Sequence, residues 1–172
     1  MLLEFDADQR LWQETVRDAV GKQCPASLVR NVAEDGTDPM PLWQTYVDAG
    51  WTELTDSENA VELAIVLEEL GRATDPTPYL ATLTQFAPLV GDRYDVQGTG
   101  AAVFSGVNAY RDADGWVLSG TDRFVLDGDR ADRLRHDAPF ERLGLAAGDA
   151  ADGDGVVPLR DDLSHPLDLS RE

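Results

Sequence analysis

The spacing of apolar residues changes once along the chain, close to the Gly98-Thr99-Gly100 segment. Before this segment, apolar side chains recur every three or four residues, which is typical of amphipathic helices. After it, short apolar runs are separated by turns rich in Asp and Gly, which favours β-strands. The sequence therefore predicts an α+β chain, with an all-α domain of about five helices over residues 1–97 and a small, incomplete antiparallel β-domain over residues 98–172.

Residues that start and stop helices divide the first domain. Asp6 is followed three residues later by Gln9, which is the spacing of a capping box at the start of a helix. Residues 59–70 form the strongest amphipathic segment, and Gly71 is predicted to end it. The acids of this segment, Glu69 among them, are expected to face water.

The fifth predicted helix, over residues 79–90, has an unusual composition for so acidic a chain. It contains Leu80, Leu83, Phe86 and Val90 but no charged residue. An amphipathic segment without charge is typical of a central, mostly buried helix.

The second domain has the pattern of a hairpin followed by weaker signals. Residues 101–110 and 116–119 flank an Asp-Ala-Asp-Gly turn, and further strands are expected at residues 123–126 and at Val156-Val157. Residues 136–155 are rich in Gly, Ala and Asp and poor in apolar residues, so a weakly ordered segment is predicted there.

Composition excludes several classes of function. The chain has 172 residues and a net charge of −19, which argues against nucleic acid and anionic membranes as partners because both require cationic side chains. No apolar run is long enough to span a bilayer, and the first residues lack the pattern of a signal peptide. Cys24 is the only cysteine, which excludes a disulfide framework and favours a reducing cytoplasm.

No self-contained active site is visible in the residues. The Asp-rich turns lack the spacing of an EF-hand, so we assign them to hairpin turns. His136 and His165 are far apart and outside any metal-binding motif, and Ser105, Ser119 and Ser170 lie in no nucleophile elbow. The residues therefore predict no metal site and no catalytic residue.

The order of several segments resembles the acyl-CoA dehydrogenase family. An amphipathic first helix, a helix ending in Gly-Trp, the segment VLEELGR at 66–72 and the Pro-Tyr-Leu-Ala start of the fifth helix resemble that family's N-terminal domain. The segment DGWVLSGTDRFVLDG at 114–128 resembles the hairpin of its middle domain. The resemblance implies an FAD-dependent enzyme that removes the α and β hydrogens of an acyl-CoA thioester, from a fatty or a steroid-derived substrate.

The resemblance also implies roles for six residues. Phe124 and Leu126 occupy the positions that lie beside the flavin ring in the family, although Leu126 has no hydroxyl; the alternative is that both are alternating core residues of a strand. Ser105 is the hydroxyl residue that would substitute in the family's flavin-lining loop. The helix over 79–90 borders the acyl pocket in the family, which implies substrate contacts from Tyr79, Leu83 and Phe86.

Two functions remain open at this point. The family's helical bundle, which supplies the catalytic glutamate, is not expected within 172 residues, so the chain would form a hetero-complex with a larger acyl-CoA dehydrogenase-like subunit that supplies the base and most flavin contacts. The alternative is a degenerate, non-catalytic structural or interaction module. Either function predicts a partner subunit or self-association, because the helical domain would otherwise expose its docking face.

Overall fold

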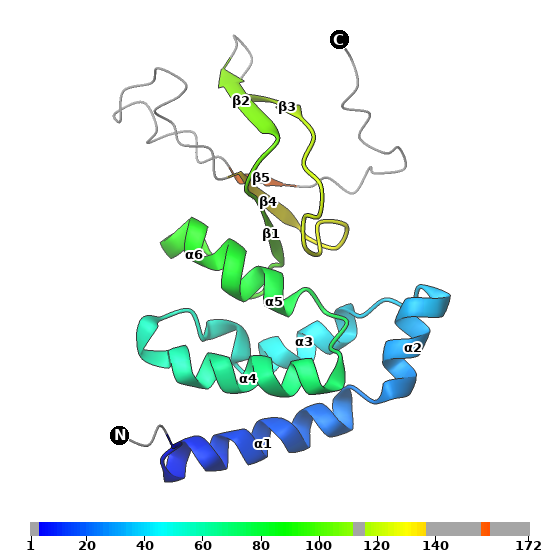
Figure 1. The fold of residues 1–172 in the computed structure, drawn as a ribbon, viewed down its shortest axis with the longest axis vertical. Helices are drawn as coiled ribbons and strands as arrows, with labels where there is room; N and C mark the ends of the chain where they lie inside the picture. Colours follow the sequence, from blue (N-terminus) through cyan, green and yellow to red (C-terminus); the bar gives the residue numbers. More distant parts are fainter. Residues whose placement is uncertain (1–3, 112–115, 137–155, 159–172) are drawn as a thin grey trace. The chain divides into compact units, whose positions relative to one another are not determined.

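The computed structural model describes residues 4–111, 116–136 and 156–158. The chain divides into two compact units, Met1–Leu83 and Thr84–Glu172, and each is described by itself. Helices fill the first unit and strands follow in the second, so the predicted α+β class is confirmed (Figure 1). The predicted boundary lay after residue 97, whereas the contacts divide the chain between Leu83 and Thr84.

Helices α1 (Ala7–Gln23) and α4 (Ala60–Ala73) lie side by side in the first unit (Figure 1). The predicted capping box at the start of α1 is confirmed, because the Asp6 carboxylate accepts a hydrogen bond from the Gln9 N–H at 2.8 Å and the Gln9 side chain accepts one from the Asp6 N–H. Helices α2 (Ala26–Asp35) and α3 (Met40–Asp48) lie between them in sequence, followed by the short 3₁₀ turns Trp51–Glu53 and Ser57–Asn59.

Aliphatic and aromatic side chains fill the core of this unit. Val16 and Val20 enter it from α1, and Ile65, Val66 and Leu70 enter it from α4. Beside them, five aromatic rings are in successive contact: Trp12, Trp51, Tyr46, Tyr79 and Trp43. Large rings bury more apolar area per residue than aliphatic side chains, so a unit of about eighty residues gains a substantial core from them.

Two expectations for α4 were wrong. The helix continues through Gly71 to Ala73 and ends at Thr74, which adopts the left-handed conformation at φ 57°. Glu69 is 2% exposed and does not face water. It follows Ile65 by one helical turn, and this spacing places it on the buried stripe of the helix.

The uncharged segment forms a helix interrupted by a π turn. It consists of α5 (Tyr79–Ala81), the π-helical turn Thr82–Phe86 and α6 (Ala87–Val90), followed by the 3₁₀ turn Gly91–Arg93. Most of its residues are buried, as predicted. The boundary between the two units falls inside the π turn, after Leu83.

The strands of the second unit form two small sheets. The predicted hairpin is present as β2 (Val107–Arg111) paired antiparallel with β3 (Trp116–Gly120). Its first strand, predicted over residues 101–110, is interrupted after Val103, and the part before the interruption belongs to the other sheet. In the other sheet, β1 (Gly100–Val103) pairs with β4 (Arg133–His136), which pairs antiparallel with β5 (Val156–Pro158). The expected strand near Val156 is therefore confirmed.

Two details of the β-domain differ from expectation. β1 and β4 are parallel, because the hairpin and the following loop return the chain to the end of the sheet where β1 began. Residues 123–126 form no strand, because Phe124 has a φ of 64°, which is incompatible with an extended ladder.

The predicted weak order of residues 136–155 falls almost wholly on 137–155, which lie outside the described residues. Within the described part of the chain, no helix has the length and apolar character needed to cross a bilayer.

Candidate functional site

Among the side chains that the structure describes in the second unit, Phe124, which follows β3 in a loop, has an unusual environment. Its side chain is 99% exposed and its backbone has a φ of 64°. A left-handed conformation costs a bulky residue about 1 kcal/mol, and burial of this ring within the unit does not offset that cost. Leu126, two residues later, is 39% exposed. The alternative that both are core residues of a strand is therefore wrong.

Hydrogen bonds from Ser105 fix the start of this loop. The Asp122 carboxylate accepts hydrogen bonds from the Ser105 N–H and hydroxyl, both at 3.2 Å, and from the Arg123 N–H at 2.6 Å. Burial opposes ionisation, but these hydrogen bonds together lower the pKa of Asp122. The structure therefore brings Ser105 beside the segment that presents Phe124.

Gly106 and Gly120 allow the chain before β2 and the chain after β3 to approach each other closely. Gly106 has a φ of 74°, and a Cβ on it would lie 2.1 Å from the Thr121 carbonyl oxygen. A Cβ on Gly120, which has a φ of 136°, would lie 2.1 Å from the Gly106 carbonyl oxygen. Only glycine permits so close an approach.

A second cluster of hydrogen bonds fixes the far end of the loop. The buried Thr99 donates to the Asp132 carboxylate from its N–H at 3.0 Å and from its hydroxyl at 2.9 Å. Within the loop, the Gly128 N–H donates to the Val125 carbonyl oxygen at 3.3 Å. Phe124 is therefore presented by a loop that is held at both ends.

The three residues assigned to the acyl pocket lie in the core. Tyr79 is fully buried, Leu83 is 2% exposed and Phe86 is 3% exposed. The Tyr79 hydroxyl donates to the Trp51 carbonyl oxygen at 2.7 Å, and the Phe86 ring lies directly against the Cα of Gly100. The outward positions of the same helical segment are Leu80, which is 50% exposed, and the exposed Thr84 and Pro88.

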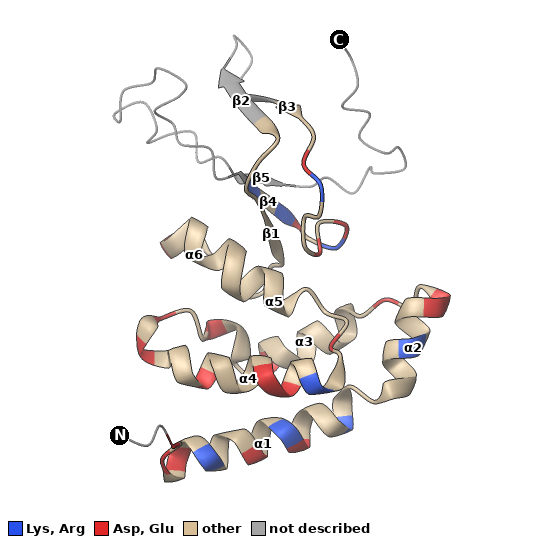
Figure 2. Ribbon diagram, viewed as in Figure 1, with Lys and Arg blue, Asp and Glu red and all other residues tan. Residues whose placement is uncertain are grey.

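This helical segment is also distinct in charge. Figure 2 shows acidic and basic residues along α1 and α4 and none on α5 and α6. A π turn such as Thr82–Phe86 is rare in proteins and is often found at functional sites. An uncharged helical face that includes such a turn is suited to contact with an apolar group.

A cluster of hydrogen-bonded polar side chains in the first unit centres on Asp75 and includes Tyr46, one of the five aromatic residues in contact. The Asp75 carboxylate accepts hydrogen bonds from the Tyr46 hydroxyl at 3.0 Å and from the Thr77 hydroxyl at 2.6 Å. Burial and the Asp75 charge raise the pKa of Tyr46, and the same two causes raise the pKa of Cys24 to about 11. Both groups are neutral at physiological pH, so neither acts as a nucleophile or base there.

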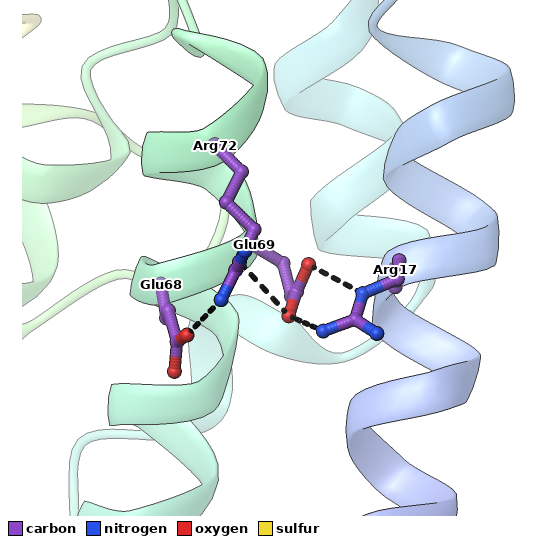
Figure 3. Close-up of polar contacts among 4 residues, drawn as sticks. All are labelled: Arg17, Glu68, Glu69 and Arg72. Atoms are coloured by element: carbon purple, nitrogen blue, oxygen red, sulfur yellow. Dashed lines mark hydrogen bonds and ion pairs between the residues drawn. The ribbon is translucent and has the colours of Figure 1, made fainter.

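The buried carboxylate of Glu69 links α1 to α4 (Figure 3). It accepts hydrogen bonds from Arg17 Nε at 3.0 Å and Nη2 at 2.8 Å, and Arg72 Nε lies 3.5 Å from it. Arg72 also pairs with Glu68. This bidentate pair neutralises the buried charge, so its role is to join two helices rather than to hold a ligand. The helical spacing from Ile65 is the sequence signal that could have revealed the burial of Glu69.

The described residues contain no group of three or more His, Cys, Asp or Glu arranged to hold a metal ion. The Ser105 hydroxyl donates to the Asp122 carboxylate, and the lowered pKa of Asp122 makes that carboxylate a weak base for activating the hydroxyl. The side chain of His136 and the whole of His165 lie outside the described part.

Comparison with known proteins identifies no relative. No family model, no curated protein and no solved structure matches the chain.

Proposed function

We propose that the chain is an acyl-CoA dehydrogenase-like subunit that contributes to FAD-dependent α,β-dehydrogenation of an acyl-CoA thioester. A larger partner subunit supplies the glutamate base and most flavin contacts. In this reaction the base removes the α proton of the thioester and the flavin accepts the β hydride. We further propose that the complex forms in the cytoplasm.

The observation that carries this proposal is the uncharged helical segment of residues 79–90. The resemblance assigns this segment to the border of the acyl pocket, and its exposed positions include Leu80 and Thr84. Because Tyr79, Leu83 and Phe86 are buried, we assign them to the support of this face and assign the apolar contact to Leu80. An acyl chain gains about 0.8 kcal/mol for each methylene that such a contact removes from water.

The test is reconstitution with a full-length acyl-CoA dehydrogenase subunit encoded in the same genome. The two chains are co-expressed, purified together and titrated with acyl-CoA under anaerobic conditions while flavin absorbance is recorded. We expect the complex to retain flavin and to lose the absorbance of oxidised flavin on substrate addition. The proposal fails if the larger chain binds flavin and oxidises acyl-CoA equally well without this chain.

A matched pair of variants tests the role of the helical face. Leu80→Asp is expected to raise the acyl-CoA concentration needed for half-reduction at least about tenfold, since a charge in an apolar contact is poorly solvated. Leu11→Asp changes a leucine that is 64% exposed on α1 and is expected to have no effect. Equal effects of the two substitutions would remove the support for an acyl contact at residues 79–90.

The second candidate is a non-catalytic interaction module. The exposure of Phe124 and Leu126 favours it, because both are apolar and neither can hydrogen-bond a flavin ring. If the reconstituted complex assembles but neither retains flavin nor oxidises acyl-CoA, this second function is the correct one.

A further inference from the structure

A series of aromatic rings connects the surface of the first unit to a buried tyrosine. The ring centroids of Trp12 and Trp51 lie 6.4 Å apart, and those of Trp51 and Tyr46 lie 5.1 Å apart in a stacked arrangement. Trp51 and Tyr46 are buried, whereas Trp12 is partly exposed. Electrons tunnel readily between aromatic rings in such close contact. An oxidant in solution that takes an electron from Trp12 can therefore draw an electron from the core.

Tyr46 lies at the buried end of this series, beside a base. Its hydroxyl donates to Asp75 Oδ1 at 3.0 Å, and the Thr77 hydroxyl donates to Oδ2 of the same carboxylate at 2.6 Å. A tyrosine that loses an electron becomes a very strong acid, so its oxidation is favourable where a base can accept the proton. The distance between the Tyr46 hydroxyl and Asp75 is within the range that such a transfer requires.

The other tyrosines differ from Tyr46 in their surroundings. The Tyr79 hydroxyl donates to the Trp51 carbonyl oxygen at 2.7 Å, and an amide oxygen is a far weaker base than a carboxylate. The Tyr94 hydroxyl is buried without a hydrogen-bond partner among the described residues, and the side chain of Tyr110 lies outside them. Burial and the Asp75 charge raise the pKa of Tyr46, so Tyr46 keeps its proton until it is oxidised.

We propose that Tyr46 is a redox-active residue that is oxidised through the two tryptophans and transfers its proton to Asp75. Trp12 first gives one electron to a one-electron oxidant at the surface. An electron from Trp51 then reduces Trp12, and an electron from Tyr46 reduces Trp51. As the Tyr46 O–H bond breaks, its proton moves to Asp75 Oδ1. The products are the reduced oxidant, a neutral Tyr46 radical and a protonated Asp75.

The direction of transfer follows from the partners of the first and last rings. The Trp12 Nε1–H donates to the Glu62 carbonyl oxygen at 3.3 Å, a weak base that leaves the oxidised ring protonated and strongly oxidising. Tyr46 does lose its proton, which makes its radical the weaker oxidant. The series therefore moves a radical inward from the surface, and the oxidants that it suits are radicals derived from oxygen. Ascorbate or a thiolate then returns the electron, and Asp75 returns the proton.

Flash photolysis of the full chain, without flavin, tests the proposal. Photoexcited ruthenium tris(bipyridine), with hexaammineruthenium(III) as the electron acceptor, provides the one-electron oxidant, and transient absorption distinguishes tryptophan from tyrosine radicals. In the wild type, the tryptophan signal is expected to decay as the tyrosine signal rises. Tyr46→Phe keeps the ring and removes the hydroxyl. It is expected to lengthen the lifetime of the tryptophan radical at least about tenfold, which corresponds to about 1.4 kcal/mol in the barrier.

Matched variants separate the role of the carboxylate from that of ring packing. Tyr79→Phe removes a hydroxyl bonded to a carbonyl oxygen and is expected to leave the lifetime unchanged. Asp75→Asn is expected to act as Tyr46→Phe does, and Trp12→Phe is expected to lower the yield of tyrosine radical. Deuterated water is expected to slow the transfer in the wild type only. Circular dichroism confirms folding, and if Asp75→Asn is unfolded, Tyr46→Phe and the isotope effect decide.

Four results would overturn the proposal. An undiminished tyrosine radical in Tyr46→Phe places the radical on another tyrosine, and an equal effect of Tyr79→Phe shows that the carboxylate has no special role. A transfer that is equally fast in deuterated water excludes proton movement to Asp75 in this step. An unchanged yield in Trp12→Phe shows that the oxidant acts elsewhere. The inference requires neither flavin nor acyl-CoA, so it and the proposed function can fail separately.

Discussion

Two residues of this protein lie in environments opposite to those their side chains prefer. Glu69 is charged and 2% exposed, whereas Phe124 is aromatic and 99% exposed. Glu69 is tolerated because Arg17 provides two hydrogen bonds in a fork geometry that matches a carboxylate. No residue in the described part of its unit covers Phe124 in a comparable way, and this difference is why Phe124 is a candidate for contact with another molecule and Glu69 is not.

The buried ion pair predicts a contrast between neighbouring glutamates. Glu69→Gln is expected to lower the free energy of unfolding by about 2 kcal/mol, because it removes a charge-assisted pair and leaves a buried amide incompletely bonded. Glu68→Gln, at a side chain that is 46% exposed, is expected to cost less than about 0.5 kcal/mol. Urea unfolding followed by tryptophan fluorescence measures both values, and equal values would show that the buried pair contributes little.

At the scale of elements, close packing between a helical segment and a strand organises the second unit. Phe86, at the end of the π turn, packs against Gly100 at the start of β1, where a Cβ would lie 2.2 Å from the ring. A π turn contains one more residue per turn than an α-helix, so it changes the direction in which the following side chains point. The glycine then provides the space that this ring requires.

Substitutions at Gly100, which packs against a ring, and at Gly71, which does not, are predicted to have opposite effects on stability. Gly100→Ala is expected to destabilise the chain by about 1 to 3 kcal/mol, because the added methyl overlaps a buried ring. Gly71→Ala is expected to stabilise it by up to about 1 kcal/mol, because Gly71 lies inside α4 and the new methyl would meet nothing within 4 Å beyond the adjacent backbone of its own helix.

Chemical denaturation with circular dichroism as the signal measures both changes. Phe86→Leu is expected to restore part of the loss in Gly100→Ala, because a smaller side chain relieves the overlap. If Gly100→Ala is neutral, or if Phe86→Leu does not reduce its effect, the packing described here is incorrect.

At the scale of the whole molecule, the distribution of charge is the dominant feature. The net charge is −19, and residues 31–71 contain ten of the acids without a single base. Arg17 and Arg72 neutralise only the two acids that end this stretch, Glu68 and Glu69. The remaining carboxylates repel one another across the surface, and this repulsion opposes the folded state.

This excess charge predicts that salt stabilises the protein. Sodium chloride screens repulsion between exposed charges, and the screening length falls from about 30 Å at 0.01 M to about 8 Å at 0.15 M. The Tm is therefore expected to rise over this range. Thermal unfolding by circular dichroism measures the change, with sucrose at matched osmolality as the control for non-ionic effects. A Tm that falls with salt would show that attractive pairs outweigh the repulsion.

The sequence by itself determined the division into helices and strands. The Asp6 capping box, the buried segment over residues 79–90 and the β2–β3 hairpin follow from spacing and turn residues, which act over a few positions and so are visible in one dimension. The resemblance to acyl-CoA dehydrogenases also came from the sequence, and the function it implies remains a prediction.

Only the tertiary structure decided which side chains are covered. Glu69 can be buried because it pairs with Arg17, a residue 52 positions away in sequence on another helix. β1 and β4 are parallel because of the path that the chain takes between them. Phe124 is exposed because Ser105 and Asp122 fix a left-handed turn where the spacing predicted a strand. Each of these features depends on contacts between residues distant in sequence, which local spacing does not specify.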